Sequence, residues 1–350
     1  MNIAFLSSSS FTLPILKSIL ESTNKTVLEV FLQQIELLPN SHHQMYSIDK
    51  LRVISELNTK ISLKLIVSQP ATFNREKLVY NPIVDFAKNY ISSQENNDKF
   101  DLWTPENFNK DRGQIFPDVD VAITASFGQF VTNSSLNIPK FGFINWHPSL
   151  LPKYRGATPL QSALFKGDKK VGLSWINMTK EMDGGDIFLQ IEKEVKVDDT
   201  FDTLINYFGE MGSQTWSIAI VNKILNISQK QNLSEVTLCN KLEKEAKFFD
   251  PNNELANQVK SQYQAFINFP TTAFMDSYFN CEVKLLEIGN ILDLQDTQSE
   301  STKIFGSWLV FKQGKKQLVY LVCKNKTLLE IRKVVLSTGK KIDFSGYQFG

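Results

Sequence analysis

Short apolar runs alternate with amphipathic segments in the first half of this chain, and this alternation limits the possible folds more than any other feature. The run Asn2–Leu6 predicts a strand, and Leu13–Ser22 follows with apolar residues at helical spacing and Pro14 in the first turn, where proline is tolerated. Ile61–Val67 and Val119–Ala125 predict buried strands. Strands that alternate with helices predict an α/β fold with a doubly wound, mostly parallel sheet.

The first strand-to-helix turn argues against a dinucleotide site. In that kind of site, glycines let the backbone approach a pyrophosphate closely. Here the turn is Ser7–Ser10 and contains no glycine. We therefore do not expect NAD to bind at this turn.

The second half of the chain predicts a different kind of domain. Phe201–Leu225 has the spacing of one long helix, and the polar run Asn226–Asn232 ends it. Period-two strands are predicted beyond it at Phe279–Ile288, Ser307–Phe311, Leu318–Cys323 and Thr327–Val335. Closely spaced short strands are typical of a small β-barrel or sandwich. Since 350 residues suit two domains, we expect a catalytic domain over 1–226, a linker over 227–244 and a C-terminal domain over 245–350.

Charge and cysteine usage narrow the class of protein. The net charge is +1, so the average charge indicates neither a nucleic acid nor a membrane as partner. The three cysteines are scattered without a CxxC pair, which argues against a zinc site and suits a reducing compartment. The N-terminus lacks the basic region and the long apolar run of a signal peptide. We expect a cytoplasmic monomer with no metal and no membrane partner.

The chemistry concentrates between Gly142 and Asp186, which hold the only histidine outside the pair His42 and His43. Alternate residues of a strand share a face, so Asn145 and His147 are expected to project together. Pro148 then ends the strand, and ligands of open α/β sheets bind at such carboxyl ends.

A carboxylate is expected beside this pair. The next strand, Leu173–Met178, leads into a loop that carries Asp183 and two glycines. If both strands end at one edge of the sheet, Asn145, His147 and Asp183 meet there. An amide donor, an imidazole and a carboxylate suit acyl transfer, because they can hold an oxyanion and move a proton. There is no serine or cysteine nucleophile at an elbow, so direct attack by an amine is expected rather than an acyl-enzyme.

Each of these residues also has an ordinary structural interpretation. Asn145 could cap a turn, His147 could be a hydrogen-bonded histidine at the sheet edge, and Asp183 could be a turn residue. Their combination with Ser149-Leu-Leu-Pro152 and Arg155-Gly-Ala favours a functional site. Asp186, just after the two glycines, is interpreted as structural.

The motif Asn145-x-His147-x-Ser149-Leu-Leu-Pro-x-Tyr-Arg155-Gly-Ala-x-Pro, followed by Asp183-Gly-Gly-Asp, resembles the 10-formyltetrahydrofolate-dependent formyltransferases. The resemblance implies a Rossmann-like formyltransferase domain, with Asn145, His147 and Asp183 as the catalytic residues. It implies that the donor, 10-formyltetrahydrofolate, contacts Ser149, Leu150, Leu151 and Pro152. The segment from about Val27 to Lys60 is extra relative to that family.

The particular residues of the motif imply which acceptor receives the formyl group. Arg155-Gly-Ala-Thr-Pro159-Leu-Gln resembles the branch that formylates methionyl-tRNA, as do Lys241-Leu-x-Lys-Glu-Ala and Gly339-Lys-Lys341 downstream. That branch carries a C-terminal OB-like β-barrel. From Lys303 onward the chain holds ten Lys and Arg residues and two acidic residues. Such a run is usually a solvated face, but beside an RNA-modifying domain it favours phosphate contact.

The basic residues expected to contact phosphate are Lys312, Lys315, Lys316, Lys324, Lys326, Arg332, Lys333, Lys340 and Lys341.

Three other functions are left open by the sequence. A sugar-nucleotide N-formyltransferase would use the same donor and the same three residues. A hydrolase of the formyl donor would release formate without an acceptor. A non-catalytic RNA-binding protein could retain the scaffold, although the intact Asn, His and Asp argue against it.

Overall fold

The computed structural model describes residues 1–39, 46–74, 77–93, 100–111, 118–293, 302–305, 307–313 and 316–349. They form two compact units. The first comprises Met1–Gly156, Lys170–Lys193 and Ile205–Leu238, and the second comprises Ala157–Lys169, Glu194–Leu204 and Cys239–Gly350. His42, His43 and Lys315 lie outside the described residues. No helix among the described residues is long and apolar enough to cross a bilayer.

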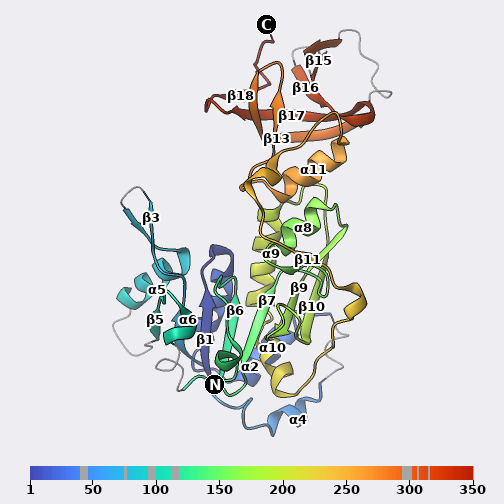
Figure 1. The fold of residues 1–350 in the computed structure, drawn as a ribbon. Coiled ribbons are helices and arrows are strands. Elements are labelled where there is room, and N and C mark those ends of the chain that lie inside the picture. Colours follow the sequence, from blue (N-terminus) through green and yellow to red (C-terminus); the bar gives the residue numbers. More distant parts are fainter. Residues whose placement is uncertain are drawn as a thin grey trace. The chain divides into compact units, whose positions relative to one another are not determined.

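The first unit is built on a seven-stranded sheet in the order β10-β9-β7-β6-β1-β2-β5 (Figure 1). Its strands are β1 (Asn2–Ser7), β2 (Ser62–Val67), β5 (Asp101–Trp103), β6 (Val121–Ala125), β7 (Phe143–His147), β9 (Lys170–Asn177) and β10 (Ile187–Glu194). The pairs from β5 through β7 are parallel, whereas β7 and β9 are antiparallel. The predicted α/β class with a mostly parallel sheet is confirmed.

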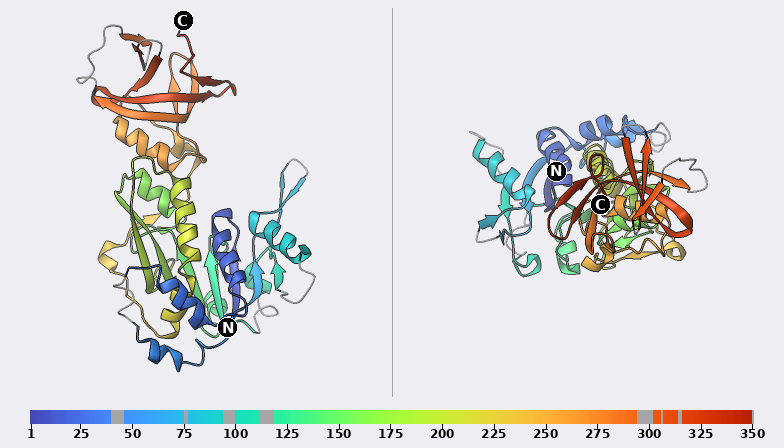
Figure 2. Two further views of the ribbon diagram at one scale, coloured as in Figure 1. Left: turned by 180° about the vertical axis from the view of Figure 1, so that it is seen from behind. Right: turned by 90° about the horizontal axis from the view of Figure 1, so that it is seen from above.

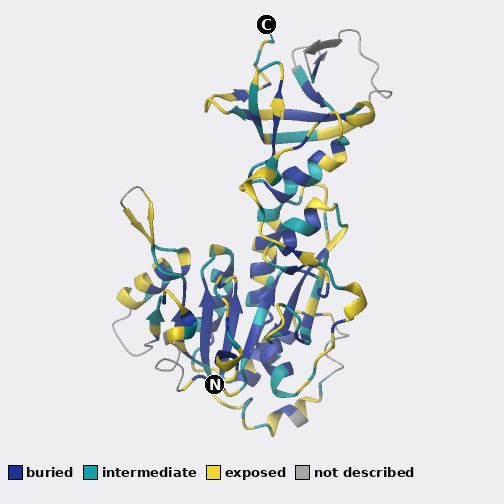
Figure 3. Ribbon diagram, in the orientation of Figure 1, coloured by how far each residue is buried: buried dark blue, intermediate teal, exposed yellow. Residues whose placement is uncertain are grey.

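The centre of this sheet is buried because its strands are continuous apolar runs, as expected for strands covered on both faces. Every residue of β6 is buried, and β1 is buried from Ile3 to Ser7 (Figure 3). The helices of this unit are α1 (Leu13–Glu21), α2 (Val27–Ile35), α4 (Ile48–Arg52), α5 (Pro82–Ser93), α6 (Phe108–Asp111), α7 (Asn133–Leu136), the greater part of α9 (Phe201–Ser213), and α10 (Trp216–Ile224). Seen from behind, α1 and α9 lie in front of the strands (Figure 2).

The extra segment after α1 contributes to this unit. Thr26 and Glu29 form a capping box, in which each side chain bonds the other's backbone N–H and so starts α2. Helix α2 packs against α10. Gln34 of α2 accepts from Ser217 Oγ at 2.6 Å and donates to Ser213 O at 2.9 Å. This part of the segment is therefore integral to the fold.

The prediction of one helix over Phe201–Leu225 is wrong, since the chain forms α9 and α10 with a break between them. Thr215 leaves helical geometry at the break, with φ of −140°. Its hydroxyl accepts from the indole N–H of Trp175 in β9 at 2.9 Å. A tertiary hydrogen bond to the sheet thus interrupts a pattern that is helical in sequence alone.

The second unit contains an antiparallel sheet in the order β12-β13-β17-β16-β15-β14, with β18 paired to β17. Its main elements are α8 (Pro159–Phe165), α11 (Ala256–Ala265), β12 (Ala273–Asp276), β13 (Cys281–Asp293), β14 (Thr302–Phe305), β15 (Trp308–Gln313), β16 (Lys316–Val322), β17 (Thr327–Leu336) and β18 (Lys341–Asp343). The predicted C-terminal β domain is confirmed. The described pairing leaves β12 and β14 as ends, so closure into an OB-like barrel stays a prediction.

Four short strands complete the chain: β3 (Thr72–Asn74) pairs with β4 (Lys77–Val79), and β8 (Arg155–Gly156) pairs with β11 (Leu238–Cys239). In the second unit Phe165 of α8 stacks on Phe266 at the end of α11, with ring centroids 5.4 Å apart. Helix α8 starts at Thr158-Pro159, where threonine and proline favour a helix N-terminus, but the Thr158 side chain donates to Asn240 O at 2.6 Å and does not cap the helix.

Helix α9 passes so close to the chain after β1 that Gly209 cannot accept a methyl group without movement. A Cβ there would lie 2.0 Å from Phe11 O, whereas one at Gly212 would meet only side-chain atoms, at 2.8 Å. Alanine gains about 1 kcal/mol of helix propensity over glycine, but overpacking against backbone costs roughly 1–3 kcal/mol. We expect Gly209→Ala to lower Tm in thermal unfolding and Gly212→Ala to lower it less. Equal effects would contradict this close packing.

Candidate active site

Strand β7 presents Asn145 and His147 on one face and Trp146 on the other, as the period of a strand requires. Trp146 is 2 % exposed and donates through its indole to Phe208 O at 3.2 Å. His147 is 4 % exposed, and Asn145 is half-buried. The apolar side of β7 therefore anchors the strand while its polar side forms the site.

Asp183 reaches this pair by a route different from the predicted one. Because β9 is antiparallel to β7, Asn177 at the end of β9 lies opposite Ile144 near the start of β7. The expectation that Asp183 follows a strand ending at the same edge as His147 is therefore wrong. The loop between β9 and β10 instead carries Asp183 back toward Asn145 and His147. The three predicted side chains meet all the same.

The Asp183 carboxylate lies between the other two side chains. Its Oδ2 is 3.6 Å from His147 Nδ1, and its Oδ1 is 3.5 Å from Asn145 Nδ2. Both separations exceed those of short hydrogen bonds. The Gly156 N–H donates to Oδ2 at 2.8 Å and holds the carboxylate more tightly. The carboxylate thus faces both side chains without a short bond to either.

A backbone carbonyl sets the tautomer of His147. Nε2 lies 3.0 Å from Tyr154 O, and a carbonyl oxygen can only accept, so Nε2 carries a proton. The Nδ1 nitrogen is the one that faces Asp183. Any proton that His147 exchanges with a substrate must therefore pass through Nδ1.

The Asn145 amide has one orientation that satisfies its neighbours. Thr124 of β6 donates through Oγ1 to Asn145 Oδ1 at 2.8 Å. This places the amide nitrogen toward the Asp183 carboxylate, whereas the flipped amide would set its oxygen against that carboxylate. One N–H of Asn145 can face Asp183, and the other remains available to a substrate oxygen.

The predicted donor contacts form a tight loop packed on β9. Ser174 of β9 donates to Ser149 O at 2.7 Å and accepts from Leu151 N at 3.2 Å. The Ser149 hydroxyl donates to Lys153 O at 2.8 Å, and Leu151 packs with Ile176 and Ile187. Leu150 lies against Gly172, and Pro152 is buried. The contact of Ser149, Leu150, Leu151 and Pro152 with a donor stays a prediction.

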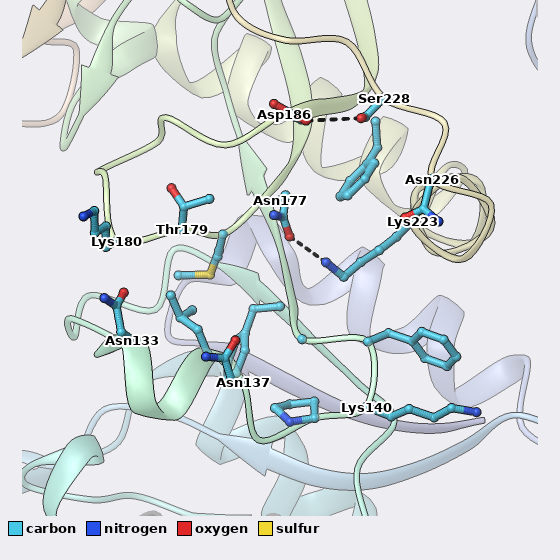
Figure 4. Close-up of a pocket in the computed structure, with 17 residues that line it drawn as sticks. Asn133, Asn137, Lys140, Asn177, Thr179, Lys180, Asp186, Lys223, Asn226 and Ser228 are labelled. Atoms are coloured by element: carbon cyan, nitrogen blue, oxygen red, sulfur yellow. Dashed lines mark hydrogen bonds between the residues drawn. The ribbon is translucent and has the colours of Figure 1, made fainter.

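A cavity of about 600 Å³ adjoins the loop that carries Asp183 (Figure 4). Thr179, Lys180 and Asp186 from this loop line one part of it. The rest is lined by α7 and the segment that leads from it into β7, by residues of β9 and β10, and by the end of α10 with the residues that follow it. Lys223 reaches across to donate to Asn177 Oδ1 at 2.6 Å, as Figure 4 shows. Burial lowers the pKa of Lys223 to about 8. None of the predicted donor contacts, Ser149 to Pro152, lines this cavity.

Several residues that shape the site were missed by the sequence interpretation. Thr124 and Gly156 contact Asn145 and Asp183 directly. Thr124 could have been suspected, because it is the polar residue near the carboxyl end of an apolar strand. Gln231 donates to Asp183 O at 2.7 Å from a polar stretch interpreted as a linker, and no sequence pattern marks it.

Comparison with known proteins places the chain in a family. A model of the formyl transferase domain matches residues 55–220. The methionyl-tRNA formyltransferase of Mycoplasma capricolum is 30 % identical over 297 residues, which cover 77 % of this chain and 89 % of that protein. The methionyl-tRNA formyltransferase of Thermotoga maritima is 35 % identical over 228 residues, covering 62 % of this chain and 71 % of that protein.

Solved structures agree on the fold. An N-formyltransferase from Helicobacter canadensis, in complex with folinic acid and dTDP-3-aminofucose, superposes with a TM-score of 0.57 at 12 % identity and covers 94 % of this chain and 98 % of its own. A 4-N formyltransferase from Francisella tularensis gives 0.55 at 17 % identity, covering 82 % and 96 %. At these identities the likeness concerns the fold alone. The sequence relatives decide the assignment: the chain belongs to the methionyl-tRNA formyltransferase family.

Proposed function

We propose that the protein transfers the formyl group of 10-formyltetrahydrofolate to the α-amino group of methionyl-tRNA and gives N-formylmethionyl-tRNA for translation initiation. The observation that carries the proposal is the meeting of Asn145, His147 and Asp183 in a chain whose relatives are methionyl-tRNA formyltransferases. From the sequence we assign residues 1–226 to catalysis, 227–244 to a linker and 245–350 to tRNA binding, although the chain up to Leu238 packs with the first unit. We expect the enzyme to work in the cytoplasm as a monomer.

The reaction needs one oxyanion site and one path for a proton. The lone pair of the amine forms a bond to the formyl carbon, and the formyl oxygen becomes an oxyanion. The free amide N–H of Asn145 and a proton on His147 Nδ1 stabilise that charge. Asp183 takes the proton that the amine loses and holds the imidazole. The oxyanion then re-forms the C=O bond, the bond from the formyl carbon to N10 breaks, and N10 takes the proton held by Asp183, which leaves tetrahydrofolate.

We expect Asn145→Ala and His147→Ala each to lower kcat strongly, since loss of one oxyanion donor costs about 10²–10³ in kcat. Formylation of methionyl-tRNA with labelled donor measures the effect, and circular dichroism checks the fold. Trp146 is not a suitable control because it anchors β7, so Asn206→Ala, at an exposed position on α9, serves instead. Turnover within a few-fold of wild type for both site variants would rule out the assignment.

We place part of the folate donor in the cavity beside the Asp183 loop, and we keep the proposed contact of the rest of the donor with Ser149, Leu150, Leu151 and Pro152, which do not line that cavity. Its volume of about 600 Å³ lies within the range of small-molecule sites. Met178, on its wall, contacts the Thr124 hydroxyl through its sulfur at 3.1 Å, and Thr124 in turn holds Asn145. Asn145, His147 and Asp183 do not line the cavity themselves, so the formyl-bearing nitrogen has to reach them past Met178 and Thr124.

Two neighbouring positions on α7 test this site. Asn133 is exposed and lines the cavity, whereas Ser134 is exposed and does not. We expect Asn133→Trp to raise the KM for 10-formyltetrahydrofolate by about tenfold, a loss of about 1.4 kcal/mol of binding. The KM for methionyl-tRNA should stay unchanged, and Ser134→Trp should alter neither value. An unchanged donor KM in Asn133→Trp would place the folate ring elsewhere.

The acceptor is proposed to contact exposed lysines of the C-terminal unit, in the turns beside β17 and at the start of β18. Lys324, Lys326, Lys340 and Lys341 are exposed and form no ion pair with a described residue. Lys333 differs, because Glu287 Oε2 lies 2.7 Å from its Nζ. The unpaired lysines can neutralise phosphates without first losing a protein partner. The side chains of Lys312 and Lys316 lie outside the part of the chain described.

The salt dependence of tRNA binding distinguishes the unpaired lysines from Lys333. We expect Lys340→Ala combined with Lys341→Ala to weaken binding of methionyl-tRNA and to reduce the slope of log K against log salt by about one per lost contact. Lys333→Ala is the matched control and should change the slope little.

A parallel incubation offers an amino-sugar nucleotide as acceptor. Formylation of that acceptor in place of methionyl-tRNA would favour the sugar-nucleotide alternative, and formate release without any acceptor would indicate a hydrolase.

A further inference from the structure

A buried arginine and a buried glutamine contact the loop that carries Asp183. Arg155 of β8 is 3 % exposed, and Gln231 is 9 % exposed. Gln231 Oε1 accepts from Arg155 Nε at 3.0 Å and from its second terminal nitrogen at 2.9 Å. The proposed mechanism uses neither side chain. These two side chains lie 76 positions apart in the sequence. Burial of a charged guanidinium and an amide costs free energy unless both are hydrogen-bonded, so their partners deserve an explanation.

The other end of the Gln231 amide holds the loop. Its Nε2 donates to Asp183 O and to Gly185 O, each at 2.7 Å. The orientation of the amide is determined, because a flipped amide would set N–H groups against the guanidinium and its oxygen against two carbonyls. Gln231 thus uses its acceptor on Arg155 and both donors on the backbone around the catalytic carboxylate.

That backbone needs an external partner to keep its shape. Asp183 has φ of 49°, in the left-handed region that is costly for a residue with a side chain. Gly185 lies against β9 so closely that a Cβ would be 1.8 Å from Asn177 O. A strained residue persists only when its surroundings hold it. The two Gln231 hydrogen bonds fall on Asp183 itself and on Gly185.

Arg155 also binds the same loop directly. One of its terminal nitrogens binds the Glu181 carboxylate, two residues before Asp183. The next residue of β8, Gly156, donates its N–H to Asp183 Oδ2 at 2.8 Å. Thus Arg155 and Gly156 contact the loop side chains while Gln231 binds its carbonyls. All of these contacts fall on the loop whose Asp183 carboxylate faces His147 Nδ1.

We propose that Gln231, oriented by Arg155, is a positioning residue that sets the Asp183 carboxylate for catalysis. The inference rests on the proposed function, in which Asp183 moves the proton. In this proposal Gln231 acts through the backbone of Asp183 and Gly185, to which it donates. Its loss changes the rate of the chemical step while leaving the binding of donor and acceptor nearly intact.

Gln231→Glu is the discriminating substitution. Glutamate keeps the acceptor for Arg155 but loses both donors, and its second oxygen faces the Asp183 and Gly185 carbonyls. Displacement of a reacting group by an ångström can cost about 10² in rate. We expect kcat to fall by about 10²-fold, with the KM for each substrate changed less than threefold, in formylation assays on the full chain.

Gln34→Glu is the matched control. Gln34 is 6 % exposed, donates to a backbone carbonyl, Ser213 O, and accepts from Ser217, so its replacement damages a buried amide network of the same kind away from Asp183. We expect Gln34→Glu to lower Tm about as much as Gln231→Glu does, and to leave kcat unchanged at temperatures below that Tm. If both glutamate variants lowered kcat alike, Gln231 would be a structural residue only.

A double-mutant cycle with Asp183→Asn completes the test. If Gln231 acts through the Asp183 carboxylate, Gln231→Glu should lower kcat little further in the Asp183→Asn background. Equal losses in both backgrounds would overturn the inference. An Asp183→Asn variant with wild-type kcat would instead overturn the proposed catalytic role of Asp183, so the two failures are distinguishable.

Discussion

The antiparallel pairing of β7 with β9 is the constraint on which the site depends. It sets Trp146 opposite Trp175 and His147 opposite Ser174, so both strands anchor large apolar side chains while their polar residues support the site. It also fixes where β9 ends, near the beginning of β7. Strand β10 starts beside that end, since Asn177 N–H donates to Asp186 O at 2.9 Å. The loop between the two strands extends toward His147, and this excursion places a carboxylate beside an imidazole.

The sequence predicts those parts of the site that depend on neighbouring residues, and it does not predict those that depend on residues far apart in the chain. Asn145 and His147 share a face because of local strand geometry, and this was predictable from two residues. The direction of β9 was not, because a short apolar run does not encode whether its neighbour is parallel. Asp183 was identified from the motif, but its path depends on that direction. Gln231 could not be found, because it recognises backbone carbonyls, which carry no sequence signal.

The same distinction holds for the fold. The α/β class, the strands β1, β2 and β6, and the C-terminal strands follow from apolar runs and their periodicity. The break between α9 and α10 does not, because it depends on a hydrogen bond from Trp175 to Thr215. Closure of the C-terminal strands into a barrel likewise depends on long-range pairing. Local pattern predicts the elements, while contacts between distant residues decide where they stop and how they join.

The position of Gln231 affects how the molecule can be divided. Composition suggests that the catalytic part stops at the polar run after α10, yet the first compact unit continues to Leu238. A fragment cut at residue 226 would retain Asn145, His147 and Asp183 and lose the glutamine that holds the Asp183 backbone. If Asn145, His147 and Asp183 react as proposed, the smallest active fragment is longer than the smallest fragment that contains them, because the stretch up to Leu238 packs with the first unit.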